Sequence, residues 1–459
     1  MIFVISLIIL FFLVFANNLY CKDRMCNIVI NIHSTWWVFL IILSALNLYS
    51  LHEVSAFTYS LIVSYILSIN AGYLVGNFIF KKDSVCLEGR CIAKDLGYYA
   101  NSIRLKLLLI VMIVVSSIIL YKFIGIIVAS SFSDAHFARL SIELFGSPLM
   151  MILYNNLIIP FSLFSMVLFC FLLIKQHYNS CFFLSFLFIG VVFCIGFGKN
   201  MILMLLLQLL CISLIVYKVN LTSLIGEYKQ NFTIIKKLVV LGFLLVFITL
   251  LFSASRETDD FLTTFFNLGE SINAFVNETV IYLVGPFRAL DYAVHNPPFL
   301  DHLGGITYGS SSIMGADKLL DWILSSLSIE YNSAYEQVGT ILQEARLSVC
   351  NEEGYFNYAF SSILYYYLDF RFIGVIIIPF VIGFILRFFI HKFNRYPSIP
   401  LFALIIFILM CCIMGFFSWE LSKPGPFAYC LYLLFFHYSF IFLKSLLLKA
   451  KGYRLSSKQ

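Results

Sequence analysis

Residues 105–130 read LKLLLIVMIVVSSIILYKFIGIIVAS, an apolar run whose only charges are Lys106 and Lys122. A helix of this length crosses about 30 Å of hydrocarbon. Because backbone groups in lipid must be satisfied within their own segment, the run predicts a membrane-spanning α-helix. The chain as a whole agrees, with 61% hydrophobic and 12% charged residues, whereas soluble domains carry about 25% charged residues. The sequence therefore predicts an all-α, polytopic integral membrane protein.

Similar apolar runs recur along the chain, and we expect about eleven membrane-spanning helices. The first run lacks the charged start and the A-x-A cleavage site of a signal peptide, so we interpret it as a retained span. The expected spans are Ile2–Leu19, Thr35–Ser50, Ala56–Phe80, Leu105–Ser130, Leu149–Ile174, Cys181–Phe197, Met201–Tyr217, Leu238–Ser253, Phe372–Ile390, Leu401–Phe417 and Phe427–Phe442.

Lysine and arginine residues indicate the orientation, because they accumulate in cytoplasmic loops. With the N-terminus outside, about 21 of the 30 Lys and Arg residues fall on the inner side. We therefore expect a periplasmic N-terminus and a cytoplasmic C-terminus. The net charge of +6 follows from these inner loops, so it does not indicate a nucleic-acid partner.

This orientation divides the chain into three regions. Residues 1–254 would hold the first eight spans and a small outer loop at 131–148, and residues 372–459 the last three spans and a cytoplasmic tail. Residues 255–371 would form a large periplasmic loop, which carries 15 of the 24 acidic residues. Since it is the only extended polar territory, we expect the substrate and catalytic region there.

The large loop is expected to be partly helical and to pack on the bundle rather than form its own domain. Apolar spacing predicts helices at Ser271–Tyr292, with a break near Gly285-Pro286, and at Ala316–Ile329. A turn-rich stretch from Gly304 to Gly315 lies between them. An aromatic helix at Tyr355–Phe370 is expected to lead into the next span.

Several arginines of the outer loops are candidate ligands for a lipid diphosphate. Arginine suits bidentate recognition of phosphate, and its position at the outer surface runs against the preference for inner loops. Pairing with a neighbouring carboxylate is the alternative for each of them. The candidates are Arg139, Arg256, Arg288 and Arg346.

Transfer of a sugar needs a base for the acceptor hydroxyl and a group that stabilises the departing diphosphate. The candidate catalytic carboxylates, chosen for their closeness to arginines and aromatic residues, are Asp291, Glu336 and Glu344. Tyrosine rings stack on sugar faces, although an interfacial aromatic belt has the same composition. The candidate sugar-binding tyrosines are Tyr331, Tyr335 and Tyr355.

Signatures of metal or nucleotide chemistry are missing from the sequence. There is no Asp-x-Asp motif and no Gly-Lys-Ser/Thr phosphate loop. We therefore predict no metal and no cofactor. The few charges inside the expected spans also argue against a proton-coupled transporter.

Two stretches of the loop resemble motifs of a known family. Residues 282–292, YLVGPFRALDY, are similar to a Tyr–Leu–x–Gly–Pro element, and residues 354–374, GYFNYAFSSILYYYLDFRFIG, resemble a Tyr–Asp–Phe–Gly–x–x–Gly stretch. Both motifs belong to oligosaccharide repeat-unit polymerases, the O-antigen polymerase (Wzy) family. The layout of spans and outer loops also resembles that family. One departure is Arg371, where the family often has glycine.

The resemblance implies a GT-C-like helical bundle that polymerises undecaprenyl-diphosphate-linked oligosaccharides into O-antigen or a related surface polysaccharide. The reaction would take place at the periplasmic face of the bacterial inner membrane, in lipopolysaccharide biosynthesis, between a lipid-linked donor and a lipid-linked acceptor. A chain-length-regulating co-polymerase is the implied partner. Family arginines important for activity tend to lie where Arg139, Arg256 and Arg288 stand here.

Two other functions are kept as alternatives. An O-antigen ligase shares the outer-loop plan and differs in its acceptor, whereas a repeat-unit flippase would be a transporter with paired helix bundles. The polymerase hypothesis predicts that Arg288→Ala abolishes the polysaccharide ladder while the protein still inserts. It also predicts that Lys318→Ala leaves the ladder intact.

Overall fold

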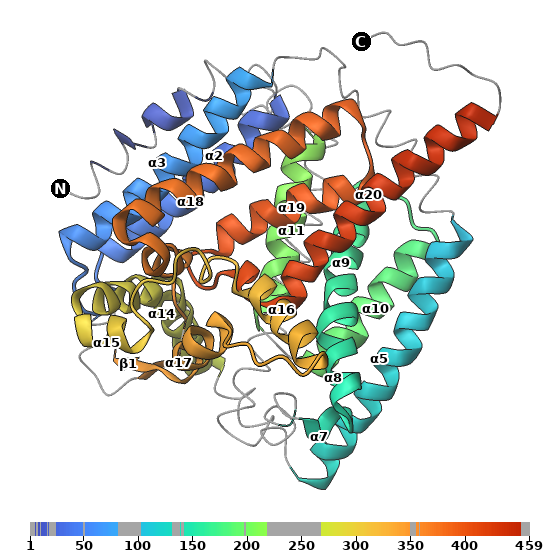
Figure 1. Ribbon diagram of the computed structural model, residues 1–459, viewed down its shortest axis with the longest axis horizontal. Coiled ribbons are helices and arrows are strands. Elements are labelled where there is room, and N and C mark those ends of the chain that lie inside the picture. Colours follow the sequence, from blue (N-terminus) through green and yellow to red (C-terminus); the bar gives the residue numbers. More distant parts are fainter. Residues whose placement is uncertain are drawn as a thin grey trace.

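The computed structural model describes residues 5, 8–9, 11–15, 17, 24–48, 51–80, 102–130, 138, 142–196, 199–217, 268–348, 355–357 and 359–450. Within these ranges the chain is helical, apart from turns and one pair of three-residue strands (Figure 1). The small strand pair is the one departure from the expected all-α class. Five helices in this part of the chain are long and apolar enough to cross a membrane. The chain is therefore a helical membrane protein, as the apolar runs predict.

The bundle is built from helices of both halves of the chain. Its long members, together with the shorter apolar helices, are α2 (Arg24–Ala45), α3 (Ala56–Ile79), α5 (Ile103–Ala129), α9 (Ile159–Ile174), α10 (Ser180–Gly196), α11 (Lys199–Tyr217), α18 (Ser362–Arg395), α19 (Ile399–Met414) and α20 (Pro424–Ala450). A short helix, α8 (Pro148–Leu153), and a π-helical turn, η2 (Tyr154–Ile158), lead into α9. Every residue of α19 is buried, so this helix lies in the centre of the bundle.

The most extensive helix pair is α3 with α18. Gly72 and Gly76 on α3 form a G-x-x-x-G pattern, which lets helix backbones approach closely in membranes. A Cβ atom at Gly72 would lie 1.9 Å from the Phe380 carbonyl oxygen, and one at Gly383 would lie 2.1 Å from the Ile69 carbonyl oxygen. The two helices therefore pack with no room for a side chain between their backbones.

The second group of helices surrounds α9. Helix α10 packs against both α5 and α9, and α11 packs against α9 and α19. The outward face of α5 exposes large apolar residues such as Val111, Val114 and Val128. Such a continuous apolar surface fits contact with lipid chains.

The expected spans match the helices best where a polar residue follows the apolar run directly. The expected Ala56–Phe80 and Leu105–Ser130 agree with α3 and α5 to within a few residues. The expected Thr35–Ser50 is wrong by about three turns at its start, because α2 begins at Arg24 and already ends at Ala45. The expected Leu238–Ser253 lies outside the described residues, as does half of Ile2–Leu19.

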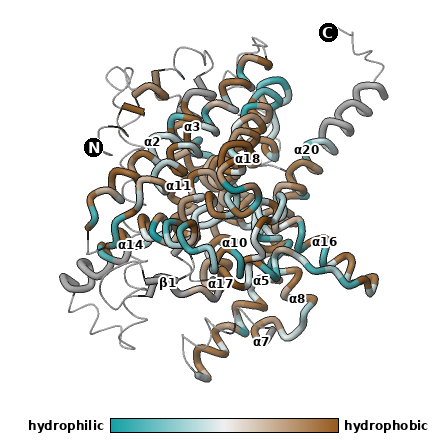
Figure 2. The backbone as a smooth tube through the Cα atoms, turned by 60° about the vertical axis from the view of Figure 1, so that its left-hand side comes forward, coloured by the Kyte–Doolittle hydropathy of each residue, from teal (hydrophilic) through white to brown (hydrophobic). Residues whose placement is uncertain are grey.

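The predicted large loop is described from residue 268 onward and contains most of the polar helices. Its elements are α14 (Leu268–His295), α15 (Pro297–His302), α16 (Met314–Ser326), the π-helical turn η3 (Tyr335–Gly339), α17 (Thr340–Glu344), β1 (Arg346–Ser348) and β2 (Tyr355–Asn357). Helices α14, α15 and α17 gather at one end of α2, α3 and α18, at the lower left of Figure 1. Hydrophilic stretches of the backbone cluster around α14 and α16 in Figure 2.

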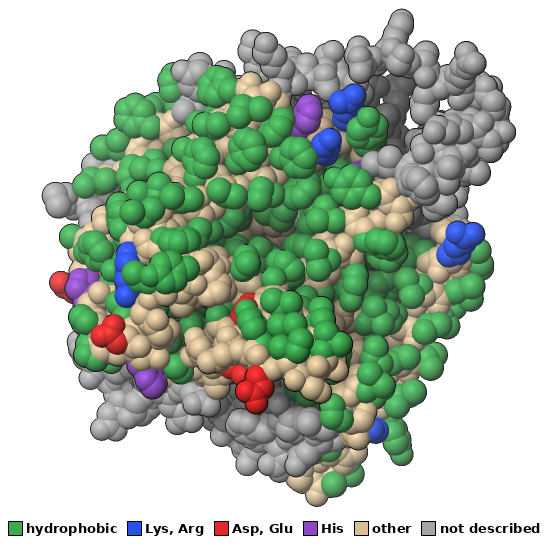
Figure 3. Space-filling view, viewed as in Figure 1, with side chains coloured by type: hydrophobic (Ala, Val, Ile, Leu, Met, Phe, Trp, Pro, Cys, Tyr) green, Lys and Arg blue, Asp and Glu red, His purple; other side chains and the backbone are tan. Residues whose placement is uncertain are grey.

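These loop helices share one core with the bundle. Phe287, Leu290 and Leu300 are buried in the same hydrophobic cluster as Trp37 of α2 and Leu364 of α18. The face drawn in Figure 3 is mainly hydrophobic, and its few Asp and Glu side chains lie in the lower left, over the segments of α14–α17. The polar segment is thus a cap packed on one end of the bundle.

Two local predictions for this cap are wrong. Helix α14 runs through Gly285-Pro286 without the expected break, because Val284 and Phe287, both fully buried, hold the helix in place on either side of the proline. The expected helix at Tyr355–Phe370 begins only at Ser362, where Ser361 caps it by accepting a hydrogen bond from the Ile363 backbone N–H. The residues before it, Tyr355–Asn357, pair with β1 instead.

Candidate functional site

Arg288 lies on α14, and its side chain is buried against the C-terminal end of α2. Its guanidinium makes five hydrogen bonds, which accounts for all five of its N–H donors. Nη1 donates to Ser44 Oγ (2.6 Å) and to the Val284 carbonyl, while Nη2 donates to the Ser44 carbonyl (2.9 Å) and to Asn47 Oδ1. Nε donates to the carbonyl of His52 (2.9 Å). Arg288 therefore closes the C-terminus of α2 and has no donor left for a diphosphate.

Asp291 lies one helical turn further along α14 and caps the next helix. Its Oδ1 accepts hydrogen bonds from the Ser55 hydroxyl (2.5 Å), the Ser55 backbone N–H (3.1 Å) and the Thr58 hydroxyl (2.6 Å). A carboxylate at a helix N-terminus is stabilised by the helix dipole. His295 Nδ1 lies 3.5 Å from the same oxygen. Asp291 is thus engaged in holding the start of α3, which disfavours its predicted role as a catalytic base.

Arg288 and Asp291 together fix the turn between α2 and α3 to α14. Arg288 binds the end of one helix and Asp291 the beginning of the next. The two residues belong to the stretch YLVGPFRALDY that resembles a polymerase motif. In this structure the polar residues of that stretch have a positioning role.

A second set of polar residues joins α16 to the segment that follows it. Asp317 on α16 accepts a hydrogen bond from Tyr331 OH (2.5 Å) and another from the Ala334 backbone N–H (2.6 Å). The hydrogen bond to Asp317 raises the pKa of Tyr331 above its usual value. Tyr331 therefore stays a neutral phenol near neutral pH.

Lys318 binds two carboxylates in the same cluster. Its Nζ lies 2.7 Å from Asp321 Oδ2 and 2.8 Å from Glu336 Oε1, and 5.6 Å from the centre of the Tyr335 ring. Burial lowers the pKa of Lys318, but the hydrogen bonds to Asp321 and Glu336 outweigh this, so the pKa is raised. The lysine is thus held charged, with a side chain that is only 14% exposed.

We call this group the α16 cluster; it consists of Asp317, Lys318, Asp321, Tyr331, Tyr335 and Glu336. It brings together three of the residues that the sequence singles out, namely Tyr331, Tyr335 and Glu336. The Glu336 side chain is 56% exposed and is held from one side by Lys318. The Glu336 carboxylate is therefore accessible to a ligand, and its hydrogen bond with Lys318 fixes its orientation.

A third polar arrangement surrounds Asp369, which is fully buried at the end of the first part of α18. Its carboxylate accepts hydrogen bonds from the Thr307 hydroxyl (2.6 Å), from the Ser311 and Ser312 backbone N–H groups (both 2.9 Å), and from the Ser312 hydroxyl. Trp419 Nε1 in turn donates to the Ser312 carbonyl (2.6 Å). Asp369 therefore anchors the turn-rich stretch 304–315 to the bundle.

The remaining predicted residues lie partly or wholly outside the described part of the chain. Arg139 and Arg256 are not described. Glu344 ends α17, and Arg346 and Tyr355 lie on the paired strands, where Arg346 is opposite Asn357 and Tyr355 opposite Ser348. Only the backbone positions of these three residues are described, so their predicted roles stay predictions.

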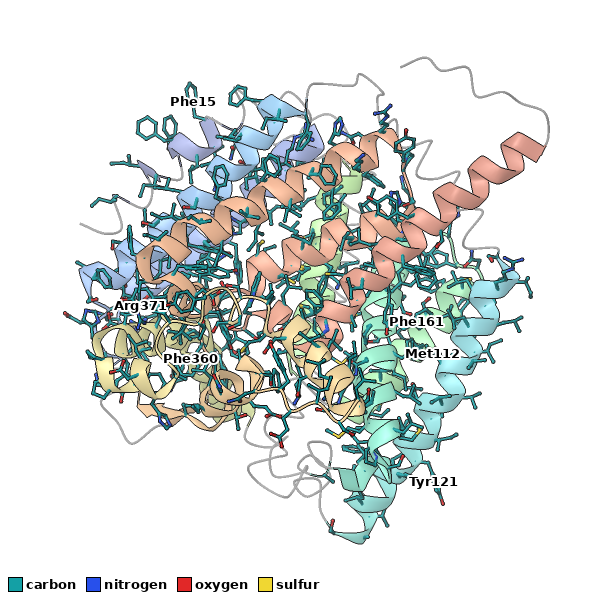
Figure 4. The ribbon with its side chains drawn as sticks, in the orientation of Figure 1. Phe15, Met112, Tyr121, Phe161, Phe360 and Arg371 are labelled. Atoms are coloured by element: carbon teal, nitrogen blue, oxygen red, sulfur yellow. The ribbon has the colours of Figure 1, made fainter. Side chains whose placement is uncertain are left out.

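Three residues with notable surroundings have no role in the sequence predictions. Asp369 stands in the quoted motif without an assigned function, Lys318 is expected there to be inert, and Arg371 is noted only as a departure from the family. Lys318 contacts Glu336, so it is not a neutral control for that site. Arg371 stands two residues after Asp369 and lies where α18 meets the cap (Figure 4).

No group of three or more His, Cys, Asp and Glu residues that could hold a metal ion occurs within the described ranges. No family model matches the chain, and no curated protein or solved structure matches it either. Its function therefore has to be argued from its own residues.

Proposed function

We propose that this chain is a glycosyltransferase that polymerises undecaprenyl-diphosphate-linked oligosaccharide units into a surface polysaccharide at the periplasmic face of the inner membrane. The two stretches that resemble O-antigen polymerases support it, as does the polar cap on one end of a helical membrane bundle. In this proposal the bundle is GT-C-like and has about eleven spans. The N-terminus is periplasmic, the C-terminus is cytoplasmic, and a co-polymerase sets the chain length.

The observation that carries the proposal is the α16 cluster. Carboxylates and tyrosines are the side chains that bind sugar hydroxyls and sugar faces. Here Tyr331, Tyr335 and Glu336 come together on a partly exposed surface of the cap. Of the two predicted catalytic carboxylates whose side chains the structure describes, Asp291 is engaged as a helix cap, and Glu336 is partly exposed and open to a ligand.

In the proposed reaction, Glu336 removes the proton of the acceptor hydroxyl as the hydroxyl oxygen forms a bond to the anomeric carbon of the donor. The bond between that carbon and the lipid diphosphate breaks, and the diphosphate leaves with the electron pair. The proton then resides on the Glu336 carboxyl group. Lys318 holds the Glu336 carboxylate in position by donating a hydrogen bond to its Oε1.

The test is to supply membranes containing the protein with lipid-linked repeat units and to measure polymer length. Glu336→Gln keeps the size of the side chain but removes its basicity, so we expect the rate of polymerisation to fall by about 10²-fold or more. Glu330→Gln is a matched control, since Glu330 is an exposed acid of the same segment. Equal polymer from Glu336→Gln and wild type, at equal protein levels, would rule out Glu336 as the base.

A further inference from the structure

Arg371 has a backbone conformation that is costly for a residue with a side chain. Its dihedrals are φ 53° and ψ −139°, and it interrupts α18 together with Phe370. These values are close to the first central position of a type II′ turn, which glycine dominates. The local backbone therefore gives no reason for an arginine at this position.

The guanidinium of Arg371 lacks a polar partner in the part of the chain that the structure describes. Its Nη1 is buried and makes no hydrogen bond, and its one recorded contact is with the Tyr367 ring, 5.5 Å from the ring centre. This differs from Arg288, whose five donors are all satisfied. A half-buried cation without an anion is unfavourable, so the site is set up for an anionic ligand.

The position of Arg371 along α18 corresponds to the phosphate level of a bilayer. The segment from Phe372 to Arg395 is about 35 Å long at 1.5 Å per residue, and Lys392 and Arg395 stand in its last turn. The hydrocarbon core is about 30 Å thick. With these basic residues at one membrane surface, Arg371 lies at the opposite one.

The surface below Arg371 is suited to a lipid chain. Along α18 the exposed residues recur at helical spacing: Phe372 is 41% exposed, Ile373 61%, Ile376 41% and Ile377 52%. They form one apolar stripe that begins next to Arg371 and continues into the membrane. A ligand with a phosphate and a hydrocarbon tail would match both parts of this surface.

We propose that Arg371 binds the phosphate group of a membrane lipid whose chain lies along the stripe formed by Phe372, Ile373, Ile376 and Ile377. The cap borders the site, since the Tyr308 ring lies edge-on to the Phe370 ring, with the ring centres 6.5 Å apart. The lipid is either a phospholipid or a polyprenyl diphosphate. Only the second identity rests on the proposed function.

The test measures lipid binding to the purified full-length protein in a neutral detergent, by native mass spectrometry. The probes are farnesyl diphosphate, phosphatidylglycerol and inorganic diphosphate. Arg371→Gln should weaken binding of at least one lipid probe by about tenfold or more, as expected for loss of a charge-assisted hydrogen bond. Inorganic diphosphate, which has no chain, should bind more weakly than farnesyl diphosphate.

Two further variants separate binding from folding and from general charge. Arg371→Gly should lose lipid binding while the melting temperature rises, because glycine relieves the backbone at this position. Arg395→Gln is the matched control, since Arg395 lies at the other end of α18 and also contacts an aromatic ring, that of Tyr396. It should bind both lipids as the wild type does.

The outcomes are separable. Loss of farnesyl diphosphate binding alone identifies a diphosphate lipid, and loss of phosphatidylglycerol binding identifies a phospholipid site. Unchanged binding of both lipids by Arg371→Gln or Arg371→Gly, or an equal loss in Arg395→Gln, would overturn the proposal. Because the assay needs no turnover, Glu336→Gln should bind lipid normally, so a failure of the proposed reaction would not be mistaken for a failure of this site.

Discussion

At the scale of single residues, Arg288 and Asp291 of α14 show how charged side chains can stabilise the fold of a membrane protein. Arg288 is 4% exposed, and it donates to the Ser44 carbonyl at the end of α2 and to the His52 carbonyl in the turn that follows. Helix ends leave such carbonyl groups without partners inside the helix. Asp291 binds the start of α3, where it accepts from the Ser55 backbone N–H and from the Ser55 and Thr58 hydroxyls. One turn of α14 thereby joins two transmembrane helices.

Replacing Arg288 should therefore affect stability before it affects chemistry. Arg288→Gln leaves several buried acceptors without donors, and we expect a loss of roughly 3 kcal/mol. Arg288→Lys should lose a similar amount, because an ammonium group cannot reach five acceptors in one plane. Thermal unfolding of the purified protein in detergent measures both.

Arg104→Gln serves as the control, because Arg104 is exposed at the start of α5. If Arg288→Lys unfolded at the wild-type temperature but bound a lipid diphosphate less tightly, the ligand role expected from the sequence would be right after all. The positioning role inferred from the five hydrogen bonds would then be wrong.

The candidate residues are predicted from the sequence to different degrees. Tyr331, Tyr335 and Glu336 can be singled out because they are close in the chain and rich in the chemistry that sugars need. The partners of Arg288, Asp291 and Asp369 come from distant segments, and no local pattern reveals them. The segment that binds Arg288 is about 240 residues away along the chain. From the sequence alone, pairing of Arg288 with a neighbouring carboxylate is therefore the simplest alternative to phosphate binding.

At the scale of secondary-structure elements, the pair α3 and α18 depends on glycine. A Cβ atom at Gly383 would lie 2.1 Å from the Ile69 carbonyl oxygen, whereas one at Gly190 on α10 would meet nothing within 4 Å. The first position cannot hold a methyl group unless the helices separate. The second is open.

This contrast gives a matched pair of substitutions. Gly383→Ala should destabilise the protein by about 1–3 kcal/mol through overpacking. Gly190→Ala should be neutral or slightly stabilising, because alanine favours the helix. Thermal unfolding measures both, and equal melting temperatures for the two variants would show that α3 and α18 do not pack as closely as described.

The element boundaries were predictable where hydrophobicity changes sharply, and less so elsewhere. The ends of α3 and α5 follow from the apolar runs, which stop at polar residues. The starts of α2 at Arg24 and of α18 at Ser362 lie in polar or aromatic sequence, where the helix extends beyond the apolar run. Pro286 signals a break, but burial of its neighbours overrides that signal.

At the scale of the whole molecule, the chain separates into an apolar bundle and a polar cap at one end. This division follows from composition, since 15 of the 24 acidic residues fall in one segment. The described part of that segment packs into the bundle's own core, which keeps the α16 cluster and Arg371 close to the apolar helices. A lipid-linked substrate bound at this end of the bundle would therefore have both its sugars and its phosphates close to the cap.

The central claim is that this chain polymerises lipid-linked repeat units, and a gel of surface glycolipids from a strain deleted for its gene tests it most directly. We expect the ladder of lengths to collapse to lipid carrying a single repeat unit. The wild-type gene should restore the ladder and Glu336→Gln should not. Glycolipid with no repeat unit at all would indicate a ligase or a flippase, and an unchanged ladder in the deletion strain would contradict the account.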